Sequence, residues 1–288
     1  MFRTLRVLAL LLSAACRQAP STGAGRLVDD AGTAVSLSRV PARVVSLIPA
    51  TTELVFALGA GDRLVGRTTW CDYPAEAARV PDLGNGIAPN IEAVVAARPD
   101  LVLLYKSGAN RAAAEQLRGF GIATLELATD RMEDFERITR LVGRALGRAA
   151  PAESLLARID RDLAAASRPP VSRPSVFILA WDRPAMTLGR GSFLSEIVKD
   201  AGARNAFDDI AASSAPVSIE AVAARDPDFI LVTGTGEPGI AGRPEWQVVR
   251  AVRERRFLRM DGSEFSRPGP RIGSAVRRLA AALDSVRR

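Results

Sequence analysis

Short apolar runs alternate with longer amphipathic segments along most of the chain, beginning near residue 43. Four runs of strand length, rich in Val, Ile and Leu, come first: RVVSLIP (43–49), RLVGRT (63–68), DLVLLY (100–105) and ATLELA (123–128). The segments that follow these strands have apolar residues at helical intervals, and we expect helices over 53–61, 91–97, 111–119 and 132–146. Strands that alternate with helices predict parallel β-α-β units.

Both ends of this first unit carry local turn and capping chemistry. GRLVDDAGTAVSL (25–37) reads as a hairpin around Asp29, Asp30 and Gly32. Thr51 or Thr52 can cap the helix over 53–61. The first unit is therefore a β/α lobe over residues 26–147.

The segment PAESLLARIDRDLAAAS (151–167) has helical apolar spacing and no strand beside it. Pro151 suits a first helical position, and RPPVSRP ends the segment. We interpret residues 148–170 as one helix that links two lobes. The strand and helix pattern then resumes in a second lobe over 171–288, with strands at 175–181, 228–233 and 255–260, a helix at 192–202 and a final helix from Ile272.

One phrase occurs twice, once in each predicted lobe. NIEAVVAARPDLVLL (90–104) and SIEAVAARDPDFILVT (218–233) each place a capping residue, a short helix, a Pro-Asp turn and a buried strand in the same order. The chain is thus built from two similar halves. Two facing β/α lobes leave a cleft at the carboxyl ends of their strands, where open sheets bind ligands.

The first residues resemble an export signal. Arg3 and Arg6 precede a short apolar stretch and small residues up to Cys16, which is too short to span a bilayer. We expect a signal peptide over 1–16, of lipoprotein type with Cys16 lipidated, and a polar tether over 17–25. This places the mature chain in the periplasm or on the extracytoplasmic membrane face, held to the membrane only by its lipid. Cys71 then has no disulfide partner, and its simplest interpretation is a sequestered thiol.

Composition excludes several classes of function. The net charge is +7, but the arginines are scattered beside Asp and Glu and form no basic stripe with aromatics, so we expect no nucleic-acid partner. The sequence has no histidine, which disfavours a site for a bare transition metal and excludes Ser-His or Cys-His nucleophile pairs. We expect no catalytic residues, no metal ligands and no cofactor.

A nucleotide-dependent enzyme is the alternative class that one motif raises. GTGEPG (234–239) matches the dinucleotide fingerprint and follows a predicted strand. That motif must open a helix whose N-terminus holds the pyrophosphate. Pro238, Gly239, Gly242 and Pro244 crowd the following turns, so a surface loop is the better interpretation.

Several motifs in a specific order resemble one family of transport proteins. These are RVVSLIPATTELVFALGAGDRLVG, WCDYP, NIEAVVAARPDLVL and FSRPGPRI. The chain from Gly25 onward resembles the substrate-binding proteins of bacterial ABC importers for vitamin B12, haem and iron siderophores, and within them is most similar to the cobalamin-binding members. The resemblance implies two β/α lobes with parallel central sheets, one long rigid helix between them and a ligand cleft between the lobes. It also implies a monomer that delivers a bulky metal chelate to a permease dimer.

The resemblance gives the repeated phrase a role. In the family a glutamate on each lobe pairs with permease arginines, and Glu92 and Glu220 occupy those places. The local alternative is that each carboxylate only stabilises the first turn of its helix, by about 0.3–1 kcal/mol. Both can hold at once, and we favour docking because a symmetric partner needs one anion on each lobe.

The resemblance also implies a set of cleft residues. Trp70 falls at a family aromatic that packs on the corrin, Arg267 at an arginine that reaches the ligand, and Met186 at another aromatic. Core packing or solvation is the ordinary alternative for each. The full expected set is Trp70, Asp72, Tyr73, Ile87, Lys106, Trp181, Met186, Phe265 and Arg267, with Lys106 and Trp181 just past strand ends.

Two departures and the other chelates leave the ligand open. Gly86 and Ile87 stand where cobalamin binders have a second tryptophan, and Ser263 replaces an aspartate, with Asp261 and Glu264 close by. Haem could use Tyr73 or Tyr105 as an axial ligand, and anionic siderophores could be met by arginines. We rank cobalamin first, a ferric siderophore second and haem third.

Overall fold

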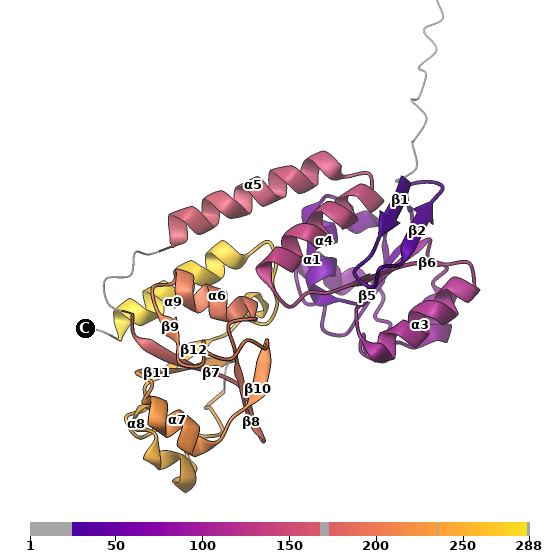
Figure 1. Ribbon diagram of the computed structural model, residues 1–288. Coiled ribbons are helices and arrows are strands. Elements are labelled where there is room, and N and C mark those ends of the chain that lie inside the picture. Colours follow the sequence, from indigo (N-terminus) through magenta and orange to yellow (C-terminus); the bar gives the residue numbers. More distant parts are fainter. Residues whose placement is uncertain (1–24, 168–172, 235, 287–288) are drawn as a thin grey trace, which may run out of the picture.

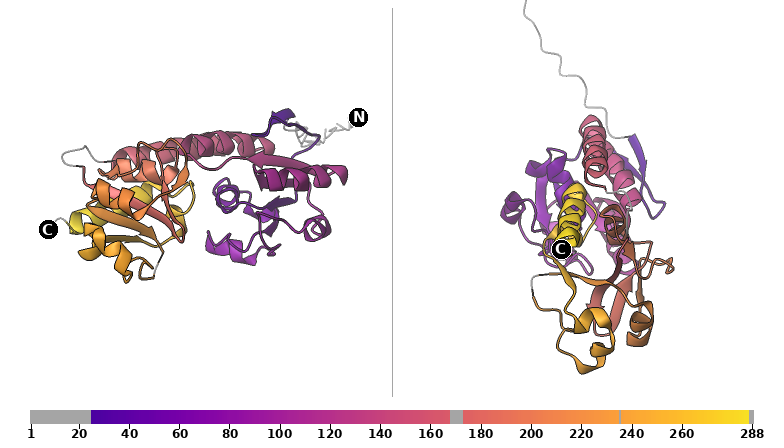
Figure 2. Two further views of the ribbon diagram at one scale, coloured as in Figure 1. Left: turned by 60° about the horizontal axis from the view of Figure 1, so that its bottom comes forward. Right: turned by 90° about the vertical axis from the view of Figure 1, so that its left-hand side faces the viewer.

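The computed structural model describes residues 25–167, 173–234 and 236–286. Two α/β lobes lie side by side, and one long helix runs from the first lobe to the second (Figures 1 and 2). This confirms the fold class that the alternating pattern predicted. Cys16, the expected signal peptide and the expected tether up to residue 24 lie outside the described residues.

The N-terminal lobe contains a four-stranded parallel sheet in the order β4-β3-β5-β6. A separate antiparallel hairpin, β1 with β2, precedes it. The strands are β1 (Gly25–Val28), β2 (Ala34–Leu37), β3 (Val44–Ser46), β4 (Leu64–Arg67), β5 (Leu101–Tyr105) and β6 (Ala123–Leu127). The helices are α1 (Pro49–Ala57), η1 (Gly61–Arg63), η2 (Ala75–Arg79), α2 (Ile91–Ala96), α3 (Gly108–Gly119) and α4 (Met132–Ala145).

Two predicted helix starts were wrong. Helix α1 begins at Pro49 after Ile48, so Thr51 and Thr52 lie inside the first turn and do not cap it. Their hydroxyls instead donate to the Ile48 carbonyl, at 3.0 and 3.2 Å, because a Thr side chain inside a helix can reach the carbonyl three or four residues before it. Helix α3 begins three residues before Arg111, since the Ser107 side chain accepts a hydrogen bond from the Asn110 backbone N–H.

The C-terminal lobe has a mixed sheet in the order β10-β8-β7-β11-β12, and β9 also pairs with β7. Strands β9, β7, β11 and β12 are parallel, whereas β8 and β10 are antiparallel additions that the sequence pattern did not predict. The strands are β7 (Ser175–Asp182), β8 (Ala185–Leu188), β9 (Arg204–Asn205), β10 (Ser214–Pro216), β11 (Phe229–Thr233) and β12 (Phe257–Met260). The helices are α6 (Phe193–Asp200), α7 (Ile219–Arg225), η3 (Pro244–Val248), α8 (Arg250–Arg253), η4 (Ser263–Phe265) and α9 (Ile272–Ser285).

Helix α5 (Ala149–Ala166) is the link between the lobes, and it begins two residues before Pro151, which was wrongly predicted as the first helical position. It packs against α4 of the N-terminal lobe and α9 of the C-terminal lobe. The approach to α9 is close: a Cβ built on Gly273 would lie 2.7 Å from the Cβ of Asp162. Glycine at this position therefore lets the two helices meet backbone to backbone.

The buried side chains explain why the two lobes hold together. One continuous apolar cluster contains residues of both lobes and of α5, among them Phe135, Ile159, Phe193 and Leu279. The outer face of each sheet has its own smaller cluster, under α2 and α3 in one lobe and under α7 and α8 in the other. Separating the lobes would expose part of the shared cluster to water, so the hydrophobic effect opposes a large opening of the two lobes.

The duplicated phrase forms the same local unit in each lobe. Asn90 caps α2 by accepting from the Ala93 N–H at 2.9 Å, and Ser218 caps α7 by accepting from the Ala221 N–H at 3.1 Å. In each lobe the helix leads directly into a buried strand, β5 or β11. The repeat in the sequence is therefore a repeat in structure.

Candidate functional site

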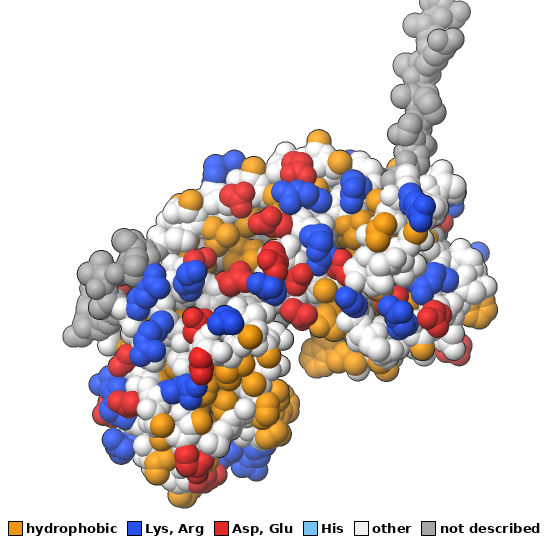
Figure 3. Space-filling view, in the orientation of Figure 1, with side chains coloured by type: hydrophobic (Ala, Val, Ile, Leu, Met, Phe, Trp, Pro, Cys, Tyr) orange, Lys and Arg blue, Asp and Glu red, His pale blue; other side chains and the backbone are white. Residues whose placement is uncertain are grey.

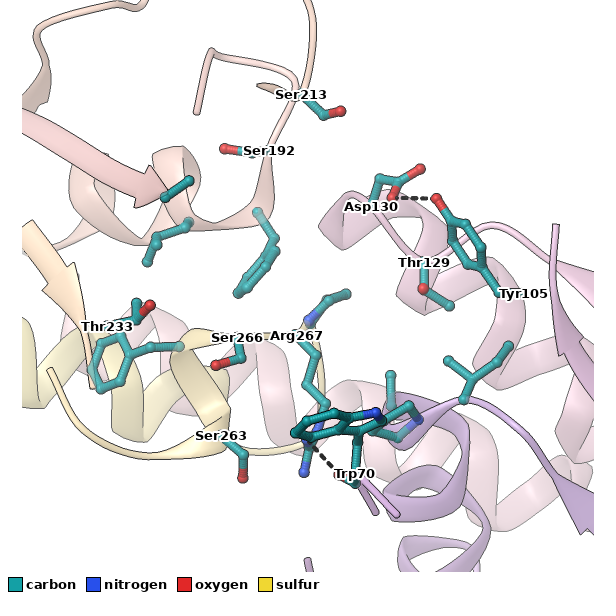
Figure 4. A pocket seen from close by; sticks show the side chains of 18 of the residues that line it. Trp70, Tyr105, Thr129, Asp130, Ser192, Ser213, Thr233, Ser263, Ser266 and Arg267 are labelled. Atoms are coloured by element: carbon teal, nitrogen blue, oxygen red, sulfur yellow. Dashed lines mark hydrogen bonds between the residues drawn. The ribbon is translucent and has the colours of Figure 1, made fainter. Parts of the chain in front are cut away.

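A cleft of about 890 Å³ lies between the two lobes. Its N-terminal wall comes from the loops after β3, β4, β5 and β6, and its C-terminal wall from the ends of β7, β8, β11 and β12 with the start of α6 (Figure 4). In the space-filling view a notch separates the lobes, and apolar side chains border it on both sides (Figure 3). The location agrees with the rule that open parallel sheets bind ligands beyond the carboxyl ends of their strands.

Trp70 and Asp72 lie on a loop that is held from beneath by Cys71. The Cys71 thiol is buried, 3.1 Å from the Thr52 hydroxyl and 3.2 Å from the Thr68 hydroxyl. Cys71 is buried, whereas its two neighbours are exposed, Trp70 to 67% of its surface and the Asp72 side chain to 61%. An exposed indole on a concave wall is typical of a ligand-binding surface.

Ile87 supplies the second exposed apolar side chain of the same wall, with 72% of its surface free. The backbone before it is tightly placed, because a Cβ on Gly86 would lie 2.2 Å from the Leu47 carbonyl oxygen. The buried Asn110 amide donates to the Gly86 carbonyl at 3.1 Å and to the Tyr105 carbonyl at 3.0 Å. Position 86 thus admits only glycine in this arrangement, and Ile87 takes the place at the cleft.

Tyr105 and Asp130 form the polar part of the N-terminal wall. The Tyr105 hydroxyl donates to the Asp130 carboxylate at 2.9 Å, and both residues line the cleft (Figure 4). Burial, and then the hydrogen bond and charge of Asp130, raise the pKa of Tyr105 to about 12. The phenol therefore stays protonated at neutral pH and acts there as a hydrogen-bond donor.

The C-terminal wall is rich in hydroxyl groups. It also has an apolar part, in which Phe193 and Phe265 are buried against the core and which continues over Ile178, Leu179, Ala180, Leu188, Leu194 and Pro268. The backbone N–H of Phe193 donates to the Asp130 carbonyl at 3.1 Å, which joins the two walls at that edge. The hydroxyl side chains of this wall are Ser192, Ser213, Ser214, Thr233, Ser263 and Ser266.

Arg267 reaches across from the C-terminal lobe to the other wall, where its terminal nitrogens find partners and its buried Nε makes no hydrogen bond. One terminal nitrogen donates to the Asp72 carboxylate, and the other lies 3.5 Å from the Trp70 carbonyl oxygen. The Nε atom lies 3.6 Å from the Glu53 carboxylate. Partial burial opposes ionisation of Asp72, but the hydrogen bond and charge of Arg267 leave its pKa below the usual value.

A second arginine, Arg271, lies next to the pair of Arg267 and Asp72 and also contacts Glu53. Arg271 donates to both oxygens of the buried Glu53 carboxylate, at 2.8 and 2.9 Å, and to Glu264 at 2.7 Å. Its guanidinium also lies over the Tyr73 ring, 3.8 Å from the centroid. Glu53 and Tyr73 of the N-terminal lobe thus both contact Arg271, at the start of α9 in the C-terminal lobe. The bidentate pair of Arg271 with Glu53 fixes the relative orientation of the two lobes at this point.

Four of the nine expected cleft residues are not among those that line it. Tyr73 lies under Arg271, and Lys106, Trp181 and Met186 are outside the lining, although Lys106 and Trp181 directly follow the lining residues Tyr105 and Ala180. Trp181 is inside β7, contrary to the prediction that it follows the strand, and its indole N–H donates to the Arg183 carbonyl at 2.9 Å. Trp70, Asp72, Ile87, Phe265 and Arg267 do lie together at the cleft.

The sequence interpretation did not include Asp130, Glu53 or the hydroxyl-rich wall. Asp130 follows strand β6 directly, so the rule that ligands meet strand ends could have indicated it. Glu53 gave no such indication, because an acidic residue in a helix is ordinarily solvated. Only the tertiary structure brings Arg267 and Arg271 against it.

Glu92 and Glu220 are both exposed, each in the first turn of its short helix. Hydrogen bonds from the backbone N–H of Glu220 and from the Ser218 hydroxyl hold the pKa of Glu220 below its usual value. Neither glutamate lies among the residues of the cleft. Both carboxylates are therefore free to meet a partner without competing with a cleft ligand.

Within the described parts of the chain, no three or more Cys, Asp or Glu side chains cluster as a metal site would require. No helix there is long and apolar enough to cross a bilayer. No α-helix opens over 236–243 after β11, and the next helical turn, η3, begins only at Pro244. The dinucleotide motif thus lacks the helix that it would need.

The chain was compared with known families and proteins. Residues 44–264 match the family model described as periplasmic binding protein. An uncharacterized ABC transporter substrate-binding lipoprotein, YvrC of Bacillus subtilis, is 32% identical over 89% of this chain and 84% of its own length. A vitamin B12-binding protein of Pectobacterium carotovorum is 28% identical over 86% of this chain and 90% of its own length.

Solved structures give the same picture. The periplasmic haem-binding protein RhuT of Roseiflexus sp. RS-1, in its apo form, has a TM-score of 0.76 with 27% identity, over 85% of this chain and 99% of its own. The periplasmic vitamin B12-binding protein BtuF of Vibrio cholerae has a TM-score of 0.66 with 26% identity, over 86% of this chain and 99% of its own.

Proposed function

This chain belongs to the periplasmic binding protein family, and from that premise we propose that it captures cobalamin or a related corrinoid for an ABC importer. As a member of this family it is a transport receptor that binds a metal chelate for a permease, and it is not an enzyme. The choice of corrinoid is supported by the chemistry of the cleft. Its walls combine exposed apolar side chains with many hydroxyls, and the one guanidinium that lines them, in the described chain, is already paired.

A corrinoid suits these walls for a physical reason. It presents a broad apolar ring face and a rim of uncharged amides, so it can cover Trp70 and Ile87 while hydroxyls meet the rim. Covering these exposed side chains removes apolar surface from water, at roughly 25 cal/mol per Å². Each rim amide needs a neutral hydrogen-bond partner, which Ser and Thr provide without the cost of burying a charge.

Haem is the second candidate, because Tyr105 lines the cleft and tyrosine can ligate ferric iron. Two features oppose it. The Tyr105 hydroxyl donates to Asp130, and its pKa is raised to about 12, so forming the phenolate that iron requires costs more than usual. Tyr73, the other tyrosine, lies under Arg271 and does not line the cleft.

Titration with ligands tests this proposal directly. Cyanocobalamin and cobinamide should quench the tryptophan fluorescence of the purified protein. Haem and ferric siderophores should quench it less. Trp70→Phe supplies the control, because Trp181 and Trp246 remain outside the cleft. That variant should keep most of its affinity, measured by calorimetry, but lose most of the quenching. Binding of haem alone, with no response to either corrinoid, would overturn the proposal.

Delivery to the permease is proposed to use Glu92 and Glu220. The two carboxylates are exposed, occupy matched positions in the repeated units and lie outside the cleft, as docking groups on a bilobal receptor should. The shared apolar cluster and α5 keep the lobes in a fixed relation, so a monomer can present both anions to two permease subunits at once. Loop hinges allow wide closure, whereas a continuous helix allows only small movements.

We also propose that Cys16 carries a lipid and holds the mature chain to the extracytoplasmic membrane face. The support is the sequence pattern before Cys16 and the similarity to YvrC, which is named as a lipoprotein. Metabolic labelling with palmitate should mark the native chain and leave Cys16→Ser unlabelled. Equal labelling of both would overturn this point.

A further inference from the structure

The cleft contains one positive charge, and that charge is already satisfied. In the described chain, Arg267 is the only Arg or Lys among the residues that line it. Two carboxylates, Asp72 and Asp130, lie in the same lining. The walls therefore carry more negative than positive charge, although the protein as a whole has a net charge of +7.

The pairing leaves little of Arg267 for a ligand. Its two terminal nitrogens face oxygens of Asp72 and Trp70, and its Nε, which is buried and makes no hydrogen bond, lies 3.6 Å from the Glu53 carboxylate. Only 12% of the side chain is exposed, compared with 61% of the Asp72 side chain. An anionic ligand would have to displace Asp72 from Arg267 and would then lie beside the released carboxylate.

Displacement has an unfavourable electrostatic balance. A ligand carboxylate would form one charge-assisted hydrogen bond with Arg267 and break an existing one of the same kind, so little is gained. The displaced Asp72 carboxylate then repels the new anion at short range. An uncharged amide or hydroxyl at the same place avoids both costs and can accept from hydroxyls nearby.

From these contacts we propose that Asp72 is a specificity-determining residue. By neutralising Arg267 it makes the cleft select chelates whose rim is uncharged over otherwise identical chelates that carry carboxylates. This inference rests on the proposed function, since it concerns which ligands the same cleft accepts. It assigns to Asp72 a role of exclusion, in addition to any direct contact.

Asp72 also has the ionisation state that this role requires. Partial burial would raise the pKa of Asp72, but the hydrogen bond and charge of Arg267 outweigh it and leave that pKa below the usual 3.8. The carboxylate is therefore charged at any pH at which the protein would meet a nutrient chelate. Selection against anions should be constant across the neutral range.

Matched ligand pairs isolate the charge. Cyanocobalamin is compared with a monocarboxylate derivative in which one rim amide is hydrolysed, and haemin is compared with its dimethyl ester. In Asp72→Asn, which keeps the side-chain shape and removes the charge, the acid should gain affinity relative to its neutral partner by roughly fivefold. Calorimetric titration of the purified protein measures the ratio of the two Kd values within each pair.

Two further variants separate this effect from a general change in charge. Asp209→Asn removes a similarly exposed carboxylate from an arginine pair outside the cleft lining, Arg225 to Asp209 at 2.6 Å, and should leave both ratios unchanged. Arg267→Gln added to Asp72→Asn should cancel the gain, because the freed guanidinium is what recognises the acid. Circular dichroism establishes that each variant is folded, and Asp72→Ser replaces Asp72→Asn if that variant is not.

The outcomes distinguish this inference from the proposed function. If the native protein binds haemin and no corrinoid, but Asp72→Asn still raises the ratio for haemin, then the corrinoid proposal is wrong and the selection by charge stands. If the native protein binds cyanocobalamin and Asp72→Asn leaves every ratio unchanged, the corrinoid proposal stands and the role of Asp72 is overturned. An equal gain in Asp209→Asn would also overturn it.

Discussion

The two walls of the cleft come from similar lobes but differ in chemistry. The N-terminal wall presents exposed apolar surface, in Trp70 and Ile87, together with the pair of Tyr105 and Asp130. The C-terminal wall presents more hydroxyls, and its apolar side chains, such as Phe193, Phe265 and Leu179, are mostly buried against the core. The outer helices α2 and α7, in contrast, are alike in the two lobes, because Glu92 and Glu220 occupy equivalent positions in their first turns.

This contrast separates two functions of one repeated scaffold. A permease dimer with two-fold symmetry would require equivalent surfaces, which the proposed docking residues Glu92 and Glu220 provide. The proposed corrinoid has an apolar face and a polar rim, and walls of different chemistry suit it. Each of the following experiments changes one lobe or one wall and asks whether the other responds.

The largest effect is expected from reversing both docking charges. Glu92→Lys with Glu220→Lys should reduce uptake on the order of 1,000-fold, since each change replaces an attraction to a permease arginine by repulsion. Uptake of labelled cyanocobalamin by cells that express the variant in place of the native protein measures this, and calorimetry should show unchanged ligand affinity. Each single reversal should give a partial loss.

Exposed glutamates outside these positions supply the control for docking. Glu115→Lys on α3 with Glu245→Lys on η3 changes the net charge equally, one residue in each lobe, and should leave uptake near the native level. If the control pair abolished uptake as well, net charge and not docking would be the cause. Loss of ligand affinity in the docking pair would instead indicate that these glutamates support the fold.

Replacing the aromatic of one wall should have the next largest effect. Trp70→Ala should weaken corrinoid binding roughly 10- to 100-fold, because an aromatic anchor at the centre of a site carries a large share of the binding energy. Trp181→Ala should change the Kd by less than about twofold, since Trp181 is a surface residue outside the cleft lining. Similar losses in the two variants would place the ligand elsewhere.

A smaller effect is expected from thinning the core that the lobes share. Ile159→Val in α5 should reduce the free energy of unfolding by about 0.5–1.5 kcal/mol, the range for loss of one buried methylene. Ile230→Val makes the same change in the core of the C-terminal lobe alone. Because the shared cluster couples the lobes, both variants should shift one common transition in urea, and two separate transitions would show that the lobes unfold independently.

The smallest effect concerns ionisation of Tyr105. Its raised pKa, about 12, means that the folded state holds the phenolic proton more tightly than the unfolded state, whose model value is 10.0. The associated stabilisation is fully present below pH 10 and is lost as the pH rises through about 12. Absorbance titration should show a late phenolate transition, which Tyr105→Phe removes and Asp130→Asn moves to lower pH. An unchanged late transition in Tyr105→Phe would contradict the assignment to Tyr105.

The sequence predicted the scaffold well because the scaffold depends on local pattern. Apolar runs of strand length, separated by helical spacing, indicated the parallel units, and the repeated phrase indicated two lobes. Strands β8 and β10 were not predicted, since short antiparallel strands in the C-terminal lobe lack a distinctive period. The cap expected at Thr51 or Thr52 was wrong, because Pro49 starts the helix earlier and the two hydroxyls turn inward.

The cleft could be located only in part from the sequence. Trp70, Ile87 and Arg267 lie on loops after predicted strands or in a family motif, and the structure brings them to one cleft. Trp181 and Met186 were indicated by similar reasoning, yet the lining does not include them, because they lie on the adjacent strands β7 and β8. The sequence predicts which strand carries a side chain, but it does not show whether that side chain faces the cleft once the lobes are assembled.

By itself, the sequence determined the two similar halves, the linking helix, the paired glutamates and the absence of histidine chemistry, since each follows from local order or composition. Only the tertiary structure decided that Arg267 is paired with Asp72, that Glu53 is buried beside two arginines, and that the exposed apolar side chains Trp70 and Ile87 lie on one wall while most hydroxyls lie on the other. These features join residues almost two hundred or more positions apart. Charge pairing over such separations depends on how the lobes face each other, and no local pattern records that.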